Sequence, residues 1–159
     1  MSAPFHRRYP MSHIAQPHGS CVCWAACLAM LLRRDLNSVI AEARSHGVPL
    51  FEDNSLQPGA VDQLARINNL RIWERPRTLN VLEAQQVADW LQRSPALVFG
   101  HQSEVGLHVV VVSGMDWSHR ADSGLQIWIH GVDPLQGAPF RRTLIGIQGD
   151  IKVHKALYR

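Results

Sequence analysis

The sequence has few of the features that anchor a chain in a membrane or cross-link its fold. Its longest apolar run, residues 24–32, is far shorter than the roughly 20 residues that a membrane-spanning helix needs. The N-terminus lacks the apolar stretch of a secretory signal peptide. All three cysteines lie between Cys21 and Cys27, so they cannot cross-link distant segments. We therefore expect no disulfide framework and a chain that folds in a reducing compartment, the cytoplasm of the producing cell.

Lysine is scarce as well, and the basic residues are scattered along the chain. The formal net charge is +3 and the pI is about 9.1, and all but two of the sixteen basic residues are arginine. Adjacent arginines occur only as the pairs 7–8, 33–34 and 141–142, and no basic run carries interleaved aromatics. This pattern argues against a nucleic-acid partner, whose binding would weaken steeply with salt.

Capping signals and apolar periodicity place helices in the first half of the chain. Asn37 is the expected N-cap of one helix, and Gly47 is its expected C-terminal stop. Asn80 and Glu83 form a pattern like a capping box at the start of another helix, which runs to about Arg93. The expected helices cover residues 23–34, 38–46, 60–68 and 81–93, and a short strand covers residues 70–74.

The second half is rich in β-branched and aromatic runs separated by Gly and Asp turns. Strands are expected at residues 96–99, 108–113 and 125–129, with two more at 141–147 and 151–154. The first twelve residues contain two prolines and are expected to form an extended arm. Helices followed by antiparallel strands predict an α+β fold in a single domain, residues 1–159, with a cleft between a helical and a strand lobe.

The three cysteines differ in what their positions allow. Cys21, Cys23 and the nearby His18 offer too few ligands for structural zinc, because the usual second chelating pair is absent, so no metal is expected. Cys27 lies one helical turn after Cys23 and is followed by leucines, so it is expected to pack as a small hydrophobe. No role is assigned to Cys21.

Cys23 stands where a loop becomes a helix. Free N–H groups and the helix dipole at a helix N-terminus favour a thiolate there, and the same N–H groups can bind an oxyanion. His108 begins a strand and is a candidate base, and Asp133 ends another apolar run and is a candidate to orient the imidazole. Asp116 competes for that orienting role, but it is more simply interpreted as a turn residue that closes the strand.

Two other histidines also compete with His108. His101 is expected in a surface loop between strands, and the alternation around His130 leaves open which face of the sheet it occupies. Taken without a partner, a histidine in an apolar strand is more often a hydrogen-bonded structural residue than a base. Because His108 occurs together with Cys23, we interpret it as a base rather than as a structural histidine.

These residues carry a family resemblance. Gln16, the motif CWAA at residues 23–26, GLHVVVVSG at residues 106–114 and VDP at residues 132–134 occur in the order typical of papain-like cysteine peptidases. The chain resembles the small bacterial branches of that clan, which include the peptidase domains of bacteriocin exporters and the effector cysteine proteases of plant pathogens. The resemblance implies a helical lobe with the nucleophile at a helix N-terminus, packed on a C-terminal antiparallel sheet.

The same resemblance implies the roles of individual residues. Cys23 corresponds to the nucleophile, His108 to the base, Asp133 to the orienting acid and Gln16 to an oxyanion donor. Gln16 lies seven positions before Cys23, whereas the family pattern usually has six. No cofactor is implied. Residues proposed to line a substrate groove are Trp24, Gly106, Leu107 and Trp117.

The activity expected from this resemblance is cleavage of protein substrates, by analogy after a small residue such as glycine. The resemblance also implies a secreted effector or toxin, exported without a signal peptide into a target cell, with an immunity or inhibitor protein as a further partner. Related folds deamidate or transglutaminate glutamine side chains, and a non-catalytic binding module is the remaining alternative. The sequence does not separate these activities, because the acceptor depends on the shape of the groove.

Overall fold

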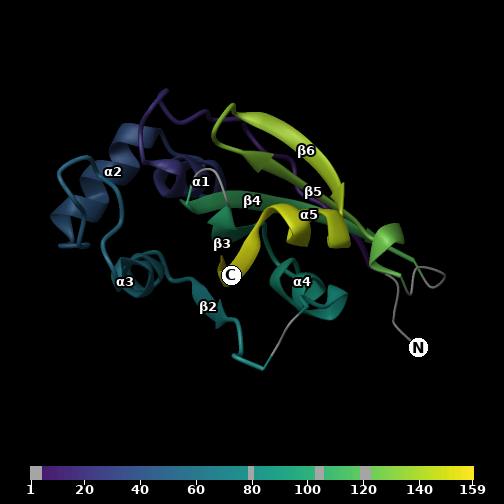
Figure 1. The fold of residues 1–159 in the computed structure, drawn as a ribbon. Coiled ribbons are helices and arrows are strands. Elements are labelled where there is room, and N and C mark those ends of the chain that lie inside the picture. Colours follow the sequence, from purple (N-terminus) through teal and green to yellow (C-terminus); the bar gives the residue numbers. More distant parts are fainter. Residues whose placement is uncertain (1–4, 79–80, 103–105, 119–122) are drawn as a thin grey trace.

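The computed structural model describes residues 5–78, 81–102, 106–118 and 123–159, and its described strands form one seven-stranded antiparallel sheet (Figure 1). The strand order is β2-β7-β3-β4-β5-β6, with β1 paired to β4 outside this path. The strands are β1 (Phe5–Arg8), β2 (Arg71–Glu74), β3 (Ala96–Gln102), β4 (Gly106–Trp117), β5 (Trp128–Asp133), β6 (Ala138–Thr143) and β7 (Lys152–Tyr158).

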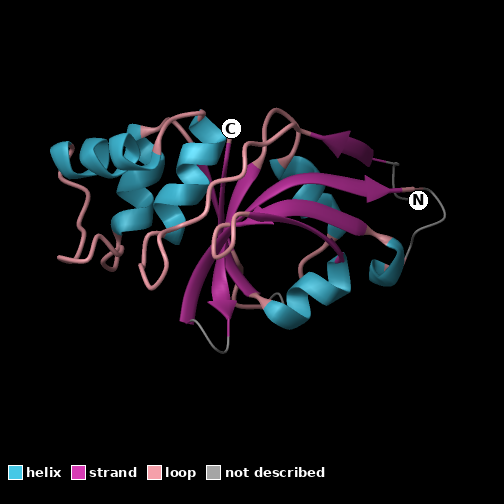
Figure 2. Ribbon diagram, turned by 90° about the horizontal axis from the view of Figure 1, so that it is seen from above, coloured by secondary structure: helices cyan, strands magenta, loops and turns pink. Residues whose placement is uncertain are grey.

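Helices pack on both sides of this sheet (Figure 2). Three of them precede the long strands and gather at one end of the molecule, where α1 packs on β4 and β3 (Figure 1). The helices are α1 (Cys23–Leu32), α2 (Leu36–Ser45), α3 (Ala60–Ile67), α4 (Ala84–Trp90) and α5 (Leu144–Asp150), with a short 3-10 helix η1 (Gly124–Gln126).

The central strands are apolar on both faces because each face is covered. In β4, Val109 and Val111 belong to the core under α1–α3, whereas Val110 and Val112 belong to the core under α4 and α5. Successive side chains of a strand point to opposite faces, so two covered faces require an unbroken apolar run rather than an alternating one. The run HVVVVS therefore folds as a central strand, and the expected α+β class is confirmed.

The N-terminal arm differs from the expectation, because residues 5–8 form β1 and pair with the second half of β4. β3 pairs only with the first half of β4, which leaves the second half free to accept β1.

The prediction of the N-cap of α2 was wrong. Asp35, not Asn37, is the N-cap of α2, and its carboxylate accepts a hydrogen bond from the Ser38 N–H at 3.3 Å.

Three other boundaries need correction. The expected strand 141–147 ends at Thr143, whose hydroxyl accepts a 3.0 Å hydrogen bond from Gly146 N–H and so begins α5. Residues 124–126 form η1, so β5 begins only at Trp128. Helix α4 is shorter than predicted, with Glu83 as its N-cap and Trp90 as its last residue. Asn80, its expected cap, lies outside the described residues.

Candidate active site

Cys23 is the first residue of α1 and is partly exposed. The backbone oxygen of the N-cap residue Val22 accepts hydrogen bonds from the N–H groups of Ala25 at 3.0 Å and Ala26 at 3.1 Å. The N–H groups of Cys23 and Trp24 come too early in the helix to have an acceptor within it. The thiol therefore stands at a helix N-terminus whose first donors point away from the helix.

His108 is held in the sheet beside Asp133. The imidazole is buried, with 1% of its surface exposed, and its Nε2 lies 2.8 Å from Oδ1 of Asp133. β4 and β5 are neighbouring strands in which Val111 pairs with Val132, so the start of β4 lies next to the end of β5. Asp133 Oδ1 also accepts a hydrogen bond from Leu135 N–H at 3.0 Å, which fixes the carboxylate.

The second ring nitrogen of His108 is available on the side of the thiol. Among the described residues, Nδ1 has no hydrogen-bond partner at normal geometry, although it is buried. Burial lowers the pKa of His108, but the hydrogen bond to Asp133 and the interaction with Cys23 outweigh it and raise the pKa from 6.5 to about 9. With Nε2 engaged by the carboxylate, the interaction with Cys23 falls to Nδ1.

The charge state of Asp133 follows from the same contacts. Burial raises the pKa of this carboxyl, but the hydrogen bonds from His108 and from Leu135 N–H outweigh burial and hold the pKa below its usual value of 3.8. The pair is therefore a carboxylate and an imidazolium near neutral pH, with Cys23 beside the cation.

Gln16 is brought to the same region by the backbone. Its N–H donates to the Pro134 carbonyl at 2.7 Å, which places it beside the Asp133 turn. Its side chain is buried and donates through Nε2 to Ser20 O at 2.6 Å, in the loop that leads to Cys23. An amide nitrogen carries two hydrogens, so one donor remains after the bond to Ser20.

The other two cysteines are separated from this chemistry. Cys27 is fully buried, and its thiol donates a hydrogen bond to Val109 O at 3.3 Å. Burial raises the pKa of Cys27 well above its ordinary value of 9.0, and the neighbouring Cys23 and Asp133 add to this rise. The prediction that Cys27 packs in the core is confirmed. Cys21 is exposed in the preceding loop.

Two of the proposed groove residues are wrong. Trp24 is 1% exposed, and its indole Nε1 donates to Asn54 O at 2.9 Å, so it packs in the helical core. Trp117 ends β4, where it is 5% exposed and packs in the other core. Gly106 and Leu107 begin β4 immediately before His108, and Leu107 is 48% exposed. Of the four residues proposed for the groove, these two therefore have the exposure that a groove edge needs.

Asp116 does not close a turn but lies inside β4, where its carboxylate contacts a second histidine, His130. Its Oδ2 lies 2.8 Å from His130 Nε2, and Arg8 Nη2 lies 2.8 Å from His130 Nδ1. His130 is 7% exposed. Sequence reasoning missed this cluster because Arg8, Asp116 and His130 meet only through the pairing of three strands.

Within the described part of the chain, no group of three or more His, Cys, Asp or Glu side chains is arranged to hold a metal ion. The helices in those same residues are all too short or too polar to cross a membrane. No family model matches the sequence, and neither does any curated protein with which it was compared.

Proposed function

We propose that this chain is a papain-like cysteine peptidase that uses Cys23, His108 and Asp133 to cleave protein substrates. The observation that carries the proposal is the two-sided environment of His108: one ring nitrogen is fixed by Asp133, and the other is unpartnered beside Cys23. A histidine with a purely structural role would be expected to satisfy both nitrogens when buried.

The arrangement suits acyl transfer. The imidazolium favours the Cys23 thiolate, which attacks a peptide carbonyl carbon and forms an S–C bond as the carbonyl π pair moves to oxygen. The N–H groups at the start of α1 are placed to bind that oxyanion, and the spare Gln16 amide hydrogen is a second donor; each is worth about 3 kcal/mol in known acyl-transfer enzymes. As the C–N bond breaks, His108 gives its proton to the amine that leaves.

Deacylation uses the same residues in the opposite direction. Neutral His108 takes a proton from water, the hydroxide oxygen bonds to the thioester carbon, and the C–S bond breaks to release the acid and the thiolate. Asp133 holds the ring so that one nitrogen always faces the sulfur, which is the orienting part of triad chemistry. The low pKa of Asp133 and the raised pKa of His108 fit that role.

The papain-like assignment of the fold is part of the same proposal. It is supported by a nucleophile at the start of a buried helix, by packing of that helix on an antiparallel sheet, and by a histidine and an acid on neighbouring strands. A groove edge at Gly106 and Leu107 and cleavage after a small residue remain parts of the proposal that peptide substrates can test.

Limiting iodoacetamide labelling at pH 6, mapped by mass spectrometry, tests the thiolate–imidazole pair. We expect Cys23 to be labelled first and the rate to fall about tenfold or more in His108→Ala, because the thiolate loses its cation. His130→Ala is the matched control: it removes the other buried, Asp-bonded histidine and should leave the labelling rate of Cys23 unchanged. Exposed Cys21 reports ordinary thiol reactivity, and buried Cys27 should stay unlabelled.

Equal slow labelling of Cys21 and Cys23, unaltered by His108→Ala, would refute the enzyme and favour a binding module. If Cys23 is selectively labelled, peptides with glycine before the scissile bond should be cut by the wild type and not by Cys23→Ala. Ammonia release from glutamine peptides without backbone cleavage would contradict the peptidase assignment and identify a deamidase with the same thiol.

A further inference from the structure

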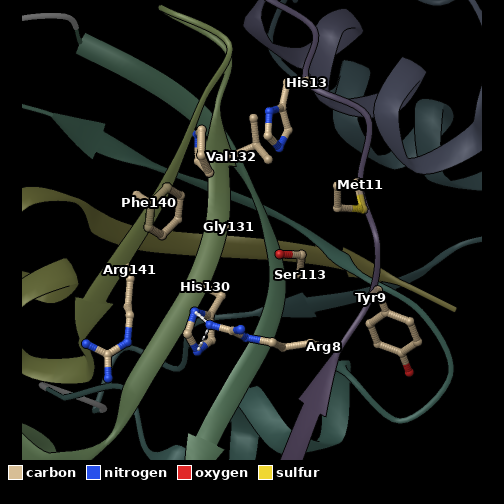
Figure 3. A pocket seen from close by; sticks show the side chains of 11 residues that line it. Arg8, Tyr9, Met11, His13, Ser113, His130, Gly131, Val132, Phe140 and Arg141 are labelled. Carbon is tan, nitrogen blue, oxygen red and sulfur yellow. Dashed lines mark hydrogen bonds between the residues drawn. The ribbon is translucent and has the colours of Figure 1, made fainter.

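A hollow lies on the sheet face next to β1. Residues 9–13, the N-terminal strap, run past the hairpin of β5 and β6 and leave a hollow of about 390 Å³ between them (Figure 3). Arg8, His130 and Arg141 form one end of this strap hollow, and Met11, His13 and Val132 form the other. Its size lies within the range of natural ligand sites.

The basic end is built by strand register. Arg8 in β1 pairs with Gly114 in β4, Gly114 pairs with His130 in β5, and His130 pairs with Arg141 in β6. Directly paired residues share a face of the sheet, and neighbouring strands lie about 4.8 Å apart. The two arginines therefore flank His130 from opposite sides of a four-strand row, as Figure 3 shows.

Glycine at position 114 makes this row possible. A Cβ there would lie 2.5 Å from Arg7 O and 3.0 Å from Arg8 Cγ, so any side chain would displace the arginine. Across the vacant position, Arg8 Nη2 reaches His130 Nδ1 at 2.8 Å. The same Nη2 lies 3.3 Å from His130 Nε2, which is also 2.8 Å from Asp116 Oδ2, so the ring is held between the guanidinium and the carboxylate.

The positive charge of the hollow is only partly balanced. Asp116 feels the charge of Arg8, but its carboxylate is bonded to His130 Nε2 at 2.8 Å and lies 3.5 Å from His6 Nδ1. In the described part of the chain, neither Arg8 nor Arg141 has a carboxylate oxygen within 4.0 Å. The Arg141 guanidinium instead stacks 3.7 Å above the Trp128 ring, which holds it in place while its N–H groups stay open at the edge.

The other end of the hollow is apolar. Met11 and Val132 line it together with His13, so a ligand meets two guanidiniums at one end and a mainly apolar surface at the other. A free inorganic anion would use only the first of these surfaces. A carboxylate carried by a chain with apolar neighbours would use both.

We propose that the strap hollow binds an acidic side chain of a peptide, with the carboxylate at the two guanidiniums and an adjacent apolar residue against Met11 and Val132. Charge complementarity determines the choice of occupant. In a chain with net charge +3, Arg8 and Arg141 occupy one row of the sheet on either side of His130, and neither has an ion-pair partner among the described residues. The proposal does not depend on the proposed peptidase activity, because it concerns binding.

The strap hollow nevertheless adjoins the segment that carries Gln16. The Gln16 N–H donates to Pro134 O, and a Cβ on Gly137 would come within 2.9 Å of Ala15 N, so residues 15–16 pack on the turn between β5 and β6. Residues 15–16 therefore connect the strap to the turn beside Asp133.

The experiment is an amide chemical-shift titration of the 159-residue chain with acetyl-Leu-Glu-Leu-amide, its neutral partner acetyl-Leu-Gln-Leu-amide, and inorganic phosphate. We expect the Glu peptide to shift the amides of His130, Gly131 and Arg141 and to bind about tenfold or more tightly than the Gln peptide. Arg141→Gln and Arg8→Gln should each weaken the Glu peptide about tenfold, since each removes a charged hydrogen-bond donor.

Arg142→Gln is the matched control, because it removes the same charge from the adjacent position of β6, where Arg142 pairs with Asp150 on the other face. It should change the affinity by no more than about twofold. If Arg8→Gln disturbs the pairing of β1 with β4, the affinity measured for Arg141→Gln tests the proposal by itself. Equal affinity for the Glu and Gln peptides, shifts confined to other strands, or phosphate binding as tightly as the Glu peptide would overturn the proposal; the last result would identify a free-anion site.

Discussion

Replacing Asp133 with asparagine should remove a part of the folding stability that depends on pH. Folding raises the pKa of His108 from 6.5 to about 9, and the hydrogen bond to Asp133 is the largest of the effects that raise it. A group whose pKa is raised by folding stabilises the native state fully below its unfolded pKa, and this stabilisation is lost as pH rises through the folded pKa. The relevant window is therefore pH 6 to 9.

The magnitude follows from the two pKa values. Taking 6.5 for the unfolded chain and about 9 for the folded protein, His108 contributes about 3 kcal/mol at pH 6 and about 0.4 kcal/mol at pH 9. Because the ring is 1% exposed, solvent screening reduces this contribution little. Asp133 has a lowered pKa and stays ionised across this window, so its own titration adds nothing to the difference.

Urea unfolding followed by tryptophan fluorescence at pH 6 and at pH 9 measures this contribution. The free energy of unfolding of Asp133→Asn is subtracted from that of the wild type at each pH. This difference should be larger at pH 6 than at pH 9, by up to about 3 kcal/mol. Asp62→Asn is the control, because it removes the same charge from an exposed carboxylate that faces Lys155 and should give the same difference at both pH values. A pH-independent loss in Asp133→Asn would refute the raised pKa of His108 and, with it, the imidazolium at the site.

Two further predictions concern the fold that carries the site. Asp35→Ala should destabilise α2 by about 1 kcal/mol by removing its N-cap, whereas Asn37→Ala should have little effect, and urea unfolding of the two variants would distinguish Asp35 from Asn37 as the cap. Gly131→Ala should cost about 1–3 kcal/mol, because its Cβ would lie 2.1 Å from Val111 O between β4 and β5; a melting temperature equal to that of the wild type would contradict this close approach.

Local signals predict the helix and strand that carry the reactive residues. The buried helix that begins at Cys23 follows from an apolar run without periodicity, and the central strand at His108 follows from a run of four valines. Both depend on side-chain chemistry within a few residues. The pairing of His108 with Asp133 was expected from the family resemblance, and the structure brings the two side chains within 2.8 Å.

Features that depend on contacts between segments far apart in the chain could not be predicted from the sequence. Residues 5–8 pair with the second half of β4 because β3 begins only at Ala96, opposite Val112, and leaves that half of β4 free on its side. The strand predicted at residues 141–147 stops at Thr143 because a threonine can cap a helix, and nothing local decides between capping and continuing. Trp24 illustrates the same limit: its ring packs in the helical core, and its N–H donates to Asn54 O, thirty positions away.

The sheet holds two His–Asp pairs with the same 2.8 Å contact, and their second nitrogens decide which of them can do chemistry. His130 lies between a guanidinium and a carboxylate, because Arg8 Nη2 is 2.8 Å from its Nδ1 and 3.3 Å from its Nε2, and Asp116 Oδ2 is 2.8 Å from Nε2. His108 has only Nε2 engaged, and its Nδ1 stays unpartnered in the described structure beside a thiol at a helix N-terminus. Proton transfer requires a nitrogen that can gain and lose a proton without breaking the contacts that hold the ring. Of the two histidines, His108 meets that requirement, which is why we propose it, and not His130, as the base.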